Sequence, residues 1–328
     1  MRKLCALRPL PMLIVVLLLT ACDGAGGEPT IQLTIPTAIA PINATDPPAI
    51  VAVSPTATLP VPPTFEPVVD PTPVPVVDSA TAVPSPELSY RVAFVESDDT
   101  LNVRSGPGVQ NGIVGVLAPD AAGVQILGAG QLVSGSRWVP IAADGLNGWV
   151  NGRFLTGDMA SETFCQDEAG RDVLMDLETA VANQDGALLA QLIHSERGLR
   201  IRQSWWNPEI EISQTDARQI FASAASYDWG VQDGSGNPIV GSFSQEILPM
   251  LQKDLLAAAE TGCDEIIHGG TAGYVRLPDG YGAVHIYSLH RPGTDEFAGM
   301  NWGTWVVGIE QWQGAFYISF LVHFQWEI

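Results

Sequence analysis

Basic residues are scarce in this sequence. Of its 328 residues, 15 are Lys or Arg and 36 are Asp or Glu, which gives a formal net charge of −21. Arg2, Lys3 and Arg8 precede an apolar run at the N-terminus, so removal of that leader would change the charge by three, to −24. Such a charge disfavours binding to nucleic acid or anionic headgroups, because both are themselves polyanions. We therefore expect no nucleic-acid partner, and solubility outside the cell.

The N-terminal apolar run is too short to span a membrane. It extends from Met12 to Leu19, whereas a transmembrane helix needs about 20 apolar residues. Basic residues precede it and the small residues Thr20 and Ala21 follow it, which is the order found in an export signal. The alternatives are a transmembrane anchor or a plainly secreted chain.

The segment Leu19-Thr20-Ala21-Cys22 resembles the lipobox of bacterial lipoproteins. In that family the Cys thiol is alkylated with diacylglycerol, and the Cys becomes the first residue after cleavage. The resemblance implies a signal peptide over residues 1–22, a lipid-modified Cys22 and membrane lipid as a partner. Asp23 resembles the inner-membrane retention signal of such proteins, so the expected location is the outer face of the cytoplasmic membrane.

Cysteine is rare as well, with four in the chain. Cys5 would leave with the leader and Cys22 would carry the lipid, which leaves Cys165 and Cys263. These two have no CxxC spacing and no neighbouring His, which argues against a zinc or redox site. Because disulfides persist outside the cell, we predict that they pair with each other. Two buried free thiols are the alternative.

Residues 23–88 form one low-complexity segment rich in Pro, Thr, Val and Ala, as in Pro71-Thr72-Pro73-Val74-Pro75. Such a composition cannot bury a core and favours extended polyproline II. We therefore predict a disordered linker that acts as a stalk. At about 3.1 Å per residue, its fully extended limit is roughly 200 Å.

Residues 89–157 alternate short apolar segments with Gly-rich turns and show no helical pattern. The segments are LNVRSGPG at 101–108, IVGVL at 113–117, VQIL at 124–127, WVPI at 138–141 and GWVN at 148–151. The LNVRSGPG and GWV motifs resemble the bacterial SH3 (SH3b) domain, which implies a small all-β SH3-like barrel. Residues 131–137 predict an unusually long hairpin loop.

The SH3b resemblance implies a wall-targeting module, because such domains typically hold a peptidoglycan peptide in a shallow groove. Asn102 and Arg104 are the candidates for contacting its amides and carboxylates, and Trp138 and Trp149 for apolar contact. In the structural alternative, Trp149 belongs to the core and Arg104 braces the fold. The domain would then be a spacer or would dock another protein.

Residues 165–328 predict an α+β domain. Apolar residues recur at helical spacing over 167–194, with a break at 183–186. Further helices are expected at 215–225, capped by Thr215 or Asp216, and at 243–260, capped by Ser244. An extended segment is expected at 199–212.

Strands are predicted at 283–289, 305–311 and 316–328, the last two joined by a turn at Gln313-Gly314. In the last of these, every even position from Phe316 to Ile328 is apolar and most odd positions are polar. Alternation of period two predicts a strand with one buried face.

This order of elements is typical of NTF2-like cone folds with an antiparallel sheet. The runs HSERG at 194–198, YDWG at 227–230, GMNW at 299–302 and HFQW at 323–326 also resemble a C-terminal domain of bacterial lipoproteins, a family that implies no activity. His285, Trp302 and His323 are the candidates for a pocket in the cone. Solvated or hydrogen-bonded histidines are the alternative.

No complete catalytic constellation is present in the sequence. Phe164-Cys165-Gln166 does not match the nucleophile motif of NlpC/P60 peptidases, and His285 and His290 would point to opposite faces of a strand rather than to one zinc ion. The run 268–277 resembles the signature of L,D-transpeptidases, but Tyr274 stands near the place of its essential Cys. We therefore expect no catalytic residue, metal or cofactor.

The leading hypothesis is a lipid-anchored envelope protein with a non-catalytic binding role. Its SH3b domain would contact peptidoglycan, and its C-terminal domain would bind an unknown protein or small ligand. One alternative is an enzyme with an acid/base site in the C-terminal cone. The other is a purely structural presenter, in which the two domains pack together.

Overall fold

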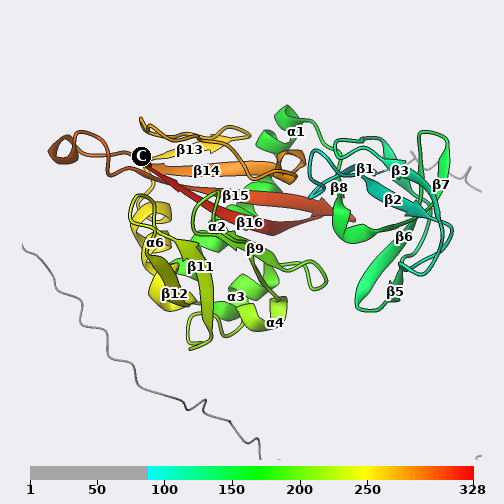
Figure 1. Cartoon of the computed structure of the whole chain (residues 1–328), viewed down its shortest axis with the longest axis horizontal. Coiled ribbons are helices and arrows are strands. Elements are labelled where there is room, and N and C mark those ends of the chain that lie inside the picture. Colours follow the sequence, from blue (N-terminus) through cyan, green and yellow to red (C-terminus); the bar gives the residue numbers. More distant parts are fainter. Residues whose placement is uncertain (1–87) are drawn as a thin grey trace, which may run out of the picture. The chain divides into compact units, whose positions relative to one another are not determined.

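The computed structural model describes residues 88–328 (Figure 1). The leader, Cys22 and nearly all of the Pro/Thr-rich linker lie outside this range, so their predictions stay predictions. Within it, no helix is both long enough and apolar enough to cross a membrane. The described part of the chain is mostly β, with few helices.

Eight strands form the first sheet, which we call the N-terminal sheet. They are β1 (Ser89–Val92), β2 (Leu101–Arg104), β3 (Ile113–Leu117), β4 (Val124–Ile126), β5 (Gln131–Val133), β6 (Ser136–Ala143), β7 (Leu146–Asn151) and β8 (Leu155–Gly157). Their order is β3-β2-β7-β6-β4-β1-β8, with β5 added to β6. All five expected segments contain strands. The long loop predicted at 131–137 is wrong, because β5 and β6 form a tight hairpin through Ser134 and Gly135, both with positive φ.

The second, C-terminal sheet has the order β10-β9-β16-β15-β14-β13. Its strands are β9 (Leu199–Arg202), β10 (Ile210–Ile212), β13 (Glu260–Cys263), β14 (His285–Arg291), β15 (Gly303–Trp312) and β16 (Ala315–Gln325). All pairs are antiparallel except β16 with β9. A separate hairpin, β11 (Ser226–Val231) with β12 (Pro238–Ser242), was not predicted.

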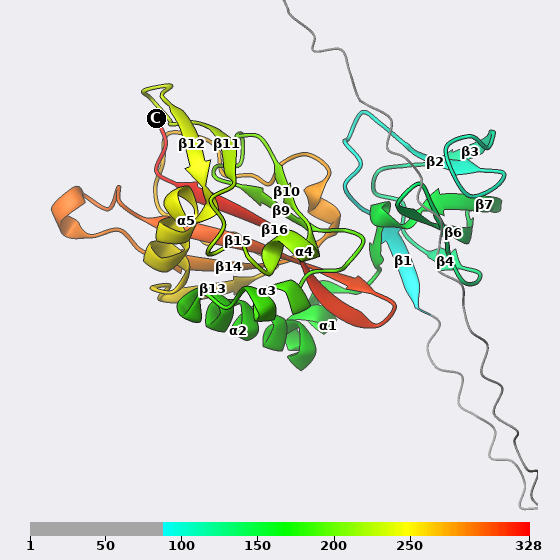
Figure 2. The ribbon, with the colours of Figure 1, turned by 90° about the horizontal axis from the view of Figure 1, so that it is seen from below.

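Helices cover one face of the C-terminal sheet (Figure 2). The predicted break at 183–186 is confirmed. Helix α2 (Glu168–Asn183) ends at Gln184 in the left-handed conformation, and Asp185 caps α3 (Gly186–Gln191). The remaining helical segments are α1 (Ser161–Gln166), α4 (Gln214–Ala217), α5 (Phe243–Glu246), α6 (Leu248–Met250) and a π turn at Leu251–Leu255, together with 3-10 turns at Gly152–Phe154, Tyr281–Ala283 and Asp295–Phe297.

Two predicted helices differ from the structure. Ser213, not Thr215 or Asp216, caps α4, which ends at Ala217 rather than near residue 225. The helix expected at 243–260 is capped by Ser242 instead of Ser244 and ends at Leu255. Glu260, the predicted last residue of this helix, is instead the first residue of β13. Its backbone pairs with β14, which supplies the hydrogen bonds that a further helical turn would otherwise provide.

Strand β16 is buried on both faces, so the prediction of one buried face is wrong. Ser319 is an extra residue opposite β15, between the pairs Ile309↔Ile318 and Gly308↔Phe320. Such a bulge shifts the alternation by one residue. Ile318 therefore packs with the helices, whereas Phe320 belongs to the core on the opposite face.

The predicted disulfide is confirmed. Cys165 in α1 and Cys263 in β13 are bonded, with Cα atoms 5.8 Å apart and a sequence separation of 98. The bond ties the segment that follows the N-terminal sheet to an edge strand of the C-terminal sheet.

Trp312, at the end of β15, belongs to the core of the N-terminal sheet. It is 4% exposed and lies edge-on to Tyr90, with ring centroids 5.4 Å apart. The guanidinium carbon of Arg197 lies 4.0 Å from the ring centroid of Trp312. Arg197 also donates to the Oε2 of Glu310 and to the carbonyl of Leu155, each at 2.7 Å. The two sheets therefore share a core, and Arg197, paired with Glu310, links them through its hydrogen bond to Leu155 in β8.

The N-terminal part of the structure also contributes a side chain to the C-terminal sheet. Phe94, which follows β1, packs against the second core of that sheet. Its ring lies edge-on to Tyr281 and to Phe320, at centroid distances of 5.3 and 6.4 Å. Arg200 places its guanidinium carbon 3.9 Å from the same ring. The segment after β1 is thus held by side chains of the C-terminal sheet.

Replacing Cys165 and Cys263 by Ala should lower the free energy of unfolding by up to about 4.7 kcal/mol, because the open chain gains the entropy of a loop of about 100 residues. Urea denaturation with and without reductant measures this loss. Reductant should destabilise the wild type and leave the double variant unchanged. An equal effect of reductant on both proteins would contradict the prediction.

Trp312→Ala should lower the free energy of unfolding by about 3–5 kcal/mol, as truncation of a buried aromatic ring in a core does. The variant also loses the stacking partner of Arg197. Leu132→Ala is the control, because Leu132 is 61% exposed. Urea denaturation measures both variants, and a loss below about 1 kcal/mol for Trp312→Ala would show that the sheets do not share a core.

Candidate functional site

A groove of about 540 Å³ opens beside Trp138 on the N-terminal sheet. We call it the Trp138 groove. Its lining includes Glu96, Asp99, Asn102, Arg104, Trp138 and Phe154. Three of the four residues that the sequence suggested for peptide binding, Asn102, Arg104 and Trp138, therefore lie around one cavity.

The alternation of β2 determines which side chains reach this groove. Val103 is fully buried, whereas Asn102 and Arg104 are partly exposed. The Nη1 of Arg104 donates to the carbonyls of Val109, at 3.0 Å, and Asn111, at 2.8 Å. Arg104 therefore braces the turn after β2 and also lines the groove.

The aromatic candidates differ in position. Trp138 is 5% exposed, so the groove has access only to a small part of its indole, beside the more exposed Phe154. Trp149 pairs with Arg104 and Pro140 in the strand ladders and is half-buried. It is not among the residues that line the groove.

Two exposed carboxylates, Glu96 and Asp99, also line the groove, and sequence reasoning missed them. Because the chain has 36 acidic residues, the presence of Asp or Glu at these two positions does not by itself indicate a binding site. They reach the groove because the segment after β1 returns along it before entering β2. With Arg104 as the one cation of the lining, these two carboxylates leave the groove with a net negative charge, which suits an ammonium group.

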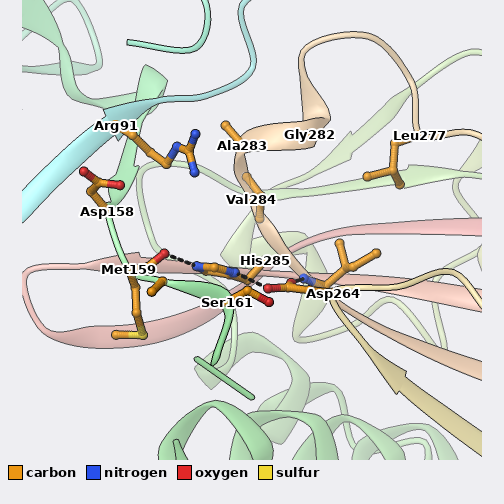
Figure 3. Close-up of a pocket in the computed structure, with 12 residues that line it drawn as sticks. Arg91, Asp158, Met159, Ser161, Asp264, Leu277, Gly282, Ala283, Val284 and His285 are labelled. Carbon is orange, nitrogen blue, oxygen red and sulfur yellow. Dashed lines mark hydrogen bonds and ion pairs between the residues drawn. The ribbon is translucent and has the colours of Figure 1, made fainter. Parts of the chain in front are cut away.

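His285, a candidate for the C-terminal pocket, lines a different cavity of about 650 Å³. We call this cavity the His285 pocket (Figure 3). Its imidazole stacks on Phe164 at a centroid distance of 4.4 Å. The Nδ1 lies 2.7 Å from the Oδ2 of Asp264, and the Nε2 lies 3.1 Å from the carbonyl of Met159 (Figure 3).

This geometry holds His285 in a structural position. Both of its ring nitrogens lie within hydrogen-bond distance of fixed oxygens, so neither is directed at a substrate as a free base. Burial raises the pKa of Asp264, but hydrogen bonds from His285, from the backbone of Ile286 and from Ser161 outweigh burial and lower it.

The other two candidates for the C-terminal pocket are interior residues. Trp302 is 2% exposed, packs in an apolar core and donates its Nε1 hydrogen to the carbonyl of Gly270 at 2.9 Å. His323 is 1% exposed and lies 4.9 Å from the Trp305 ring, centroid to centroid. Neither residue lines the His285 pocket, so the three candidates do not share a cavity.

His323 belongs to a buried ionic cluster around Asp254. Its Nε2 lies 2.8 Å from one carboxylate oxygen, and Arg291 donates its Nε hydrogen to the other at 2.7 Å. Burial raises the pKa of Asp254, but His323 and Arg291 lower it further than burial raises it. The cluster is a structural ion pair that joins β14, β16 and the π turn.

Comparison with known proteins identifies the N-terminal sheet. Residues 99–156 match the family model of the bacterial SH3 domain. This stretch is a bacterial SH3 domain. No curated protein and no solved structure matches the chain. The Trp138 groove is lined mainly by residues of this domain and of the segment that joins it to β1.

Within residues 88–328, no group of three or more His, Cys, Asp or Glu side chains is placed to hold a metal ion. The Trp138 groove itself is a mixed polar and apolar groove. Its lining includes two carboxylates, two amide groups, one guanidinium group and the aromatic carbon of Trp138 and Phe154.

Asp254→Asn should lower the free energy of unfolding by about 3–5 kcal/mol at pH 6, because it leaves Arg291 and His323 without their buried anion. The folded-state pKa of Asp254 lies below its unfolded value. Its stabilisation is therefore complete above the unfolded value, about 3.9, and is lost as the pH falls through the folded value.

Urea denaturation between pH 6 and pH 2.5 measures this effect. The difference in the free energy of unfolding between the wild type and Asp254→Asn should become smaller below about pH 4. Asp144→Asn is the matched control, because it makes the same chemical change at an exposed turn. A difference in the free energy of unfolding that stays constant over this pH range would contradict the role of Asp254 as the buried anion of the cluster.

Proposed function

We propose that this chain is a lipid-anchored envelope protein whose SH3 domain binds a peptidoglycan peptide without cleaving it. The observation that carries the proposal is the Trp138 groove, where Asn102, Arg104 and Trp138 line one cavity. Its amide and guanidinium groups suit the backbone and carboxylates of a peptide, and its aromatic wall suits apolar side chains.

A non-catalytic role is supported by the engagement of the groups that could do chemistry. Both nitrogens of His285 are hydrogen-bonded, and His323 is enclosed with Asp254. A cone that hosts an acid/base site needs an open interior. Here Val306, Phe320 and Phe324 fill one face of the C-terminal sheet as an apolar core.

Attachment to the membrane is part of the proposal. Cys22, in its lipobox-like setting, would carry diacylglycerol, and residues 23–88 would lift the folded part away from the lipid. This arrangement suits a protein whose ligand is the cell wall, since it keeps the SH3 domain outside the cytoplasmic membrane and within reach of peptidoglycan. The confirmed disulfide fits an oxidising compartment.

For the C-terminal domain we propose an NTF2-like arrangement of helices on one face of a mostly antiparallel sheet, with a role in binding. A purely structural role as a presenter is the second candidate. The observation that favours it is the shared core, in which Trp312 enters the SH3 domain and Phe94 enters the C-terminal sheet. An apolar interface of this kind restricts movement between domains.

A pulldown of the full chain on purified sacculi tests the proposed function. Asn102→Ala combined with Asp99→Asn should lower retention by about tenfold, because it removes a hydrogen-bonding amide and a charge from the groove. The matched control is Asn147→Ala combined with Asp144→Asn, which makes the same changes at exposed positions of the β6–β7 hairpin. This control should bind like the wild type.

Equal retention of the wild type and both double variants would show that the Trp138 groove is not the binding site. No retention of a folded wild-type chain would exclude wall binding altogether and leave the presenter role. Release of peptide fragments from the sacculi would contradict the non-catalytic part of the proposal.

A further inference from the structure

The Trp138 groove continues onto the C-terminal domain. A second cavity, of about 600 Å³, is lined by Glu96, Arg202, Trp205, Arg276 and Asp279, among others. We call it the Arg276 hollow. Glu96 lines both the groove and the hollow. A ligand that lies in the groove therefore has a path past Glu96 into a cavity with two guanidinium groups.

Arg276 is held by aromatic rings instead of by an acid. Its guanidinium carbon lies 4.8 Å from the Trp205 ring centroid and 5.9 Å from that of Tyr274. The Trp205 indole is itself fixed, because its Nε1 donates to Glu327 at 3.2 Å. Stacking uses the face of the guanidinium and leaves its N–H edge for an acceptor.

Arg276 differs in this respect from most arginines of the described chain. Ion pairs with carboxylates hold Arg137, Arg153, Arg197, Arg200, Arg202 and Arg291. No carboxylate within residues 88–328 forms a salt bridge with Arg276, and its side chain is exposed. In so acidic a chain, an unpaired and oriented guanidinium is a site for a carboxylate from outside.

Asp279 is an anion near Arg276 and also lines the hollow, but the two side chains form no salt bridge, and both oxygens of Asp279 accept other hydrogen bonds. One oxygen accepts hydrogen bonds from the backbone N–H of Ser97, at 3.0 Å, and from its hydroxyl, at 2.8 Å. The other accepts the Gly280 N–H at 3.0 Å. These hydrogen bonds lower the pKa of Asp279, so it stays ionised and holds the loop that carries Glu96.

We infer that the Arg276 hollow binds a free carboxylate of the same peptide whose ammonium group meets Glu96 and Asp99 in the Trp138 groove. The ligand class is therefore a zwitterionic peptide with a free side-chain amine and a free carboxylate. This inference rests on the proposed function and adds a carboxylate-binding site on the C-terminal domain to it. The SH3 domain supplies the anionic end of the site, and the C-terminal domain supplies the cationic end.

Calorimetric titration of the full chain with a synthetic stem tetrapeptide (L-alanine, D-glutamate, L-lysine, D-alanine) tests the inference. A second peptide carries an amide in place of its C-terminal carboxylate alone. The wild type should bind the free acid about tenfold more tightly than the amide, because a bidentate ion pair is lost. Arg276→Gln should bind both peptides with the affinity that the wild type has for the amide.

Two control variants separate the ends of the site. Arg218→Gln removes an exposed arginine that does not line the groove or the hollow and should keep the tenfold preference for the free acid. Glu96→Gln should lower the affinity for both peptides by the same factor, because it removes a charge that faces the ammonium group and not the carboxylate. Thermal unfolding at the wild-type temperature shows that each variant is folded.

The outcomes distinguish the two proposals. If the wild-type chain binds neither peptide, the proposed function fails and the inference fails with it. If the wild type binds and Arg276→Gln retains the full preference for the free acid, the inference is overturned and the proposed function stands. Loss of that preference in Arg276→Gln, with Arg218→Gln unchanged, establishes the carboxylate site.

Discussion

The buried ion pair of Arg197 with Glu310 is the interaction on which the rest of the structure depends. Arg197 is 3% exposed and Glu310 is fully buried. The free-energy cost of removing either charge from water is offset by its pairing with the other. Arg197 also donates to the carbonyls of Leu155, at 2.7 Å, and Gly152, at 2.5 Å. One side chain from the C-terminal domain therefore satisfies backbone groups of the SH3 domain.

The composition of the groove follows from this junction. Because Trp312 enters one core and Phe94 enters the other, the segment between β1 and β2 cannot move independently of the C-terminal sheet. The same segment carries Glu96 and Asp99, which line the Trp138 groove. A groove that would belong to the SH3 domain alone is thereby extended toward Arg276. A binding role and a presenter role are compatible, since the interface that stiffens the protein also builds the site.

Local patterns predicted much of the fold. The strands of the SH3 domain, the helix break at 183–186, the β15–β16 turn and the pairing of Cys165 with Cys263 were all deduced from spacing, turn residues or compartment. The errors have more than one physical cause. The end of the helix at Leu255 is set by pairing of β13 with β14, which a short window around the helix does not contain, whereas the bulge at Ser319 is a shift of register between the neighbouring strands β15 and β16 that alternation alone does not encode.

The sequence by itself determined the chemistry that this protein has available. It has an SH3 motif with Asn102 and Arg104 on an outward face, a cystine and a strongly negative charge. Only the tertiary structure decided which groups are available to a ligand. It buried His323 with Asp254 and Trp302 in a core, and it brought Glu96 and Arg276 to adjoining cavities. Burial and proximity arise from contacts between residues far apart in the chain, and residue type does not encode them.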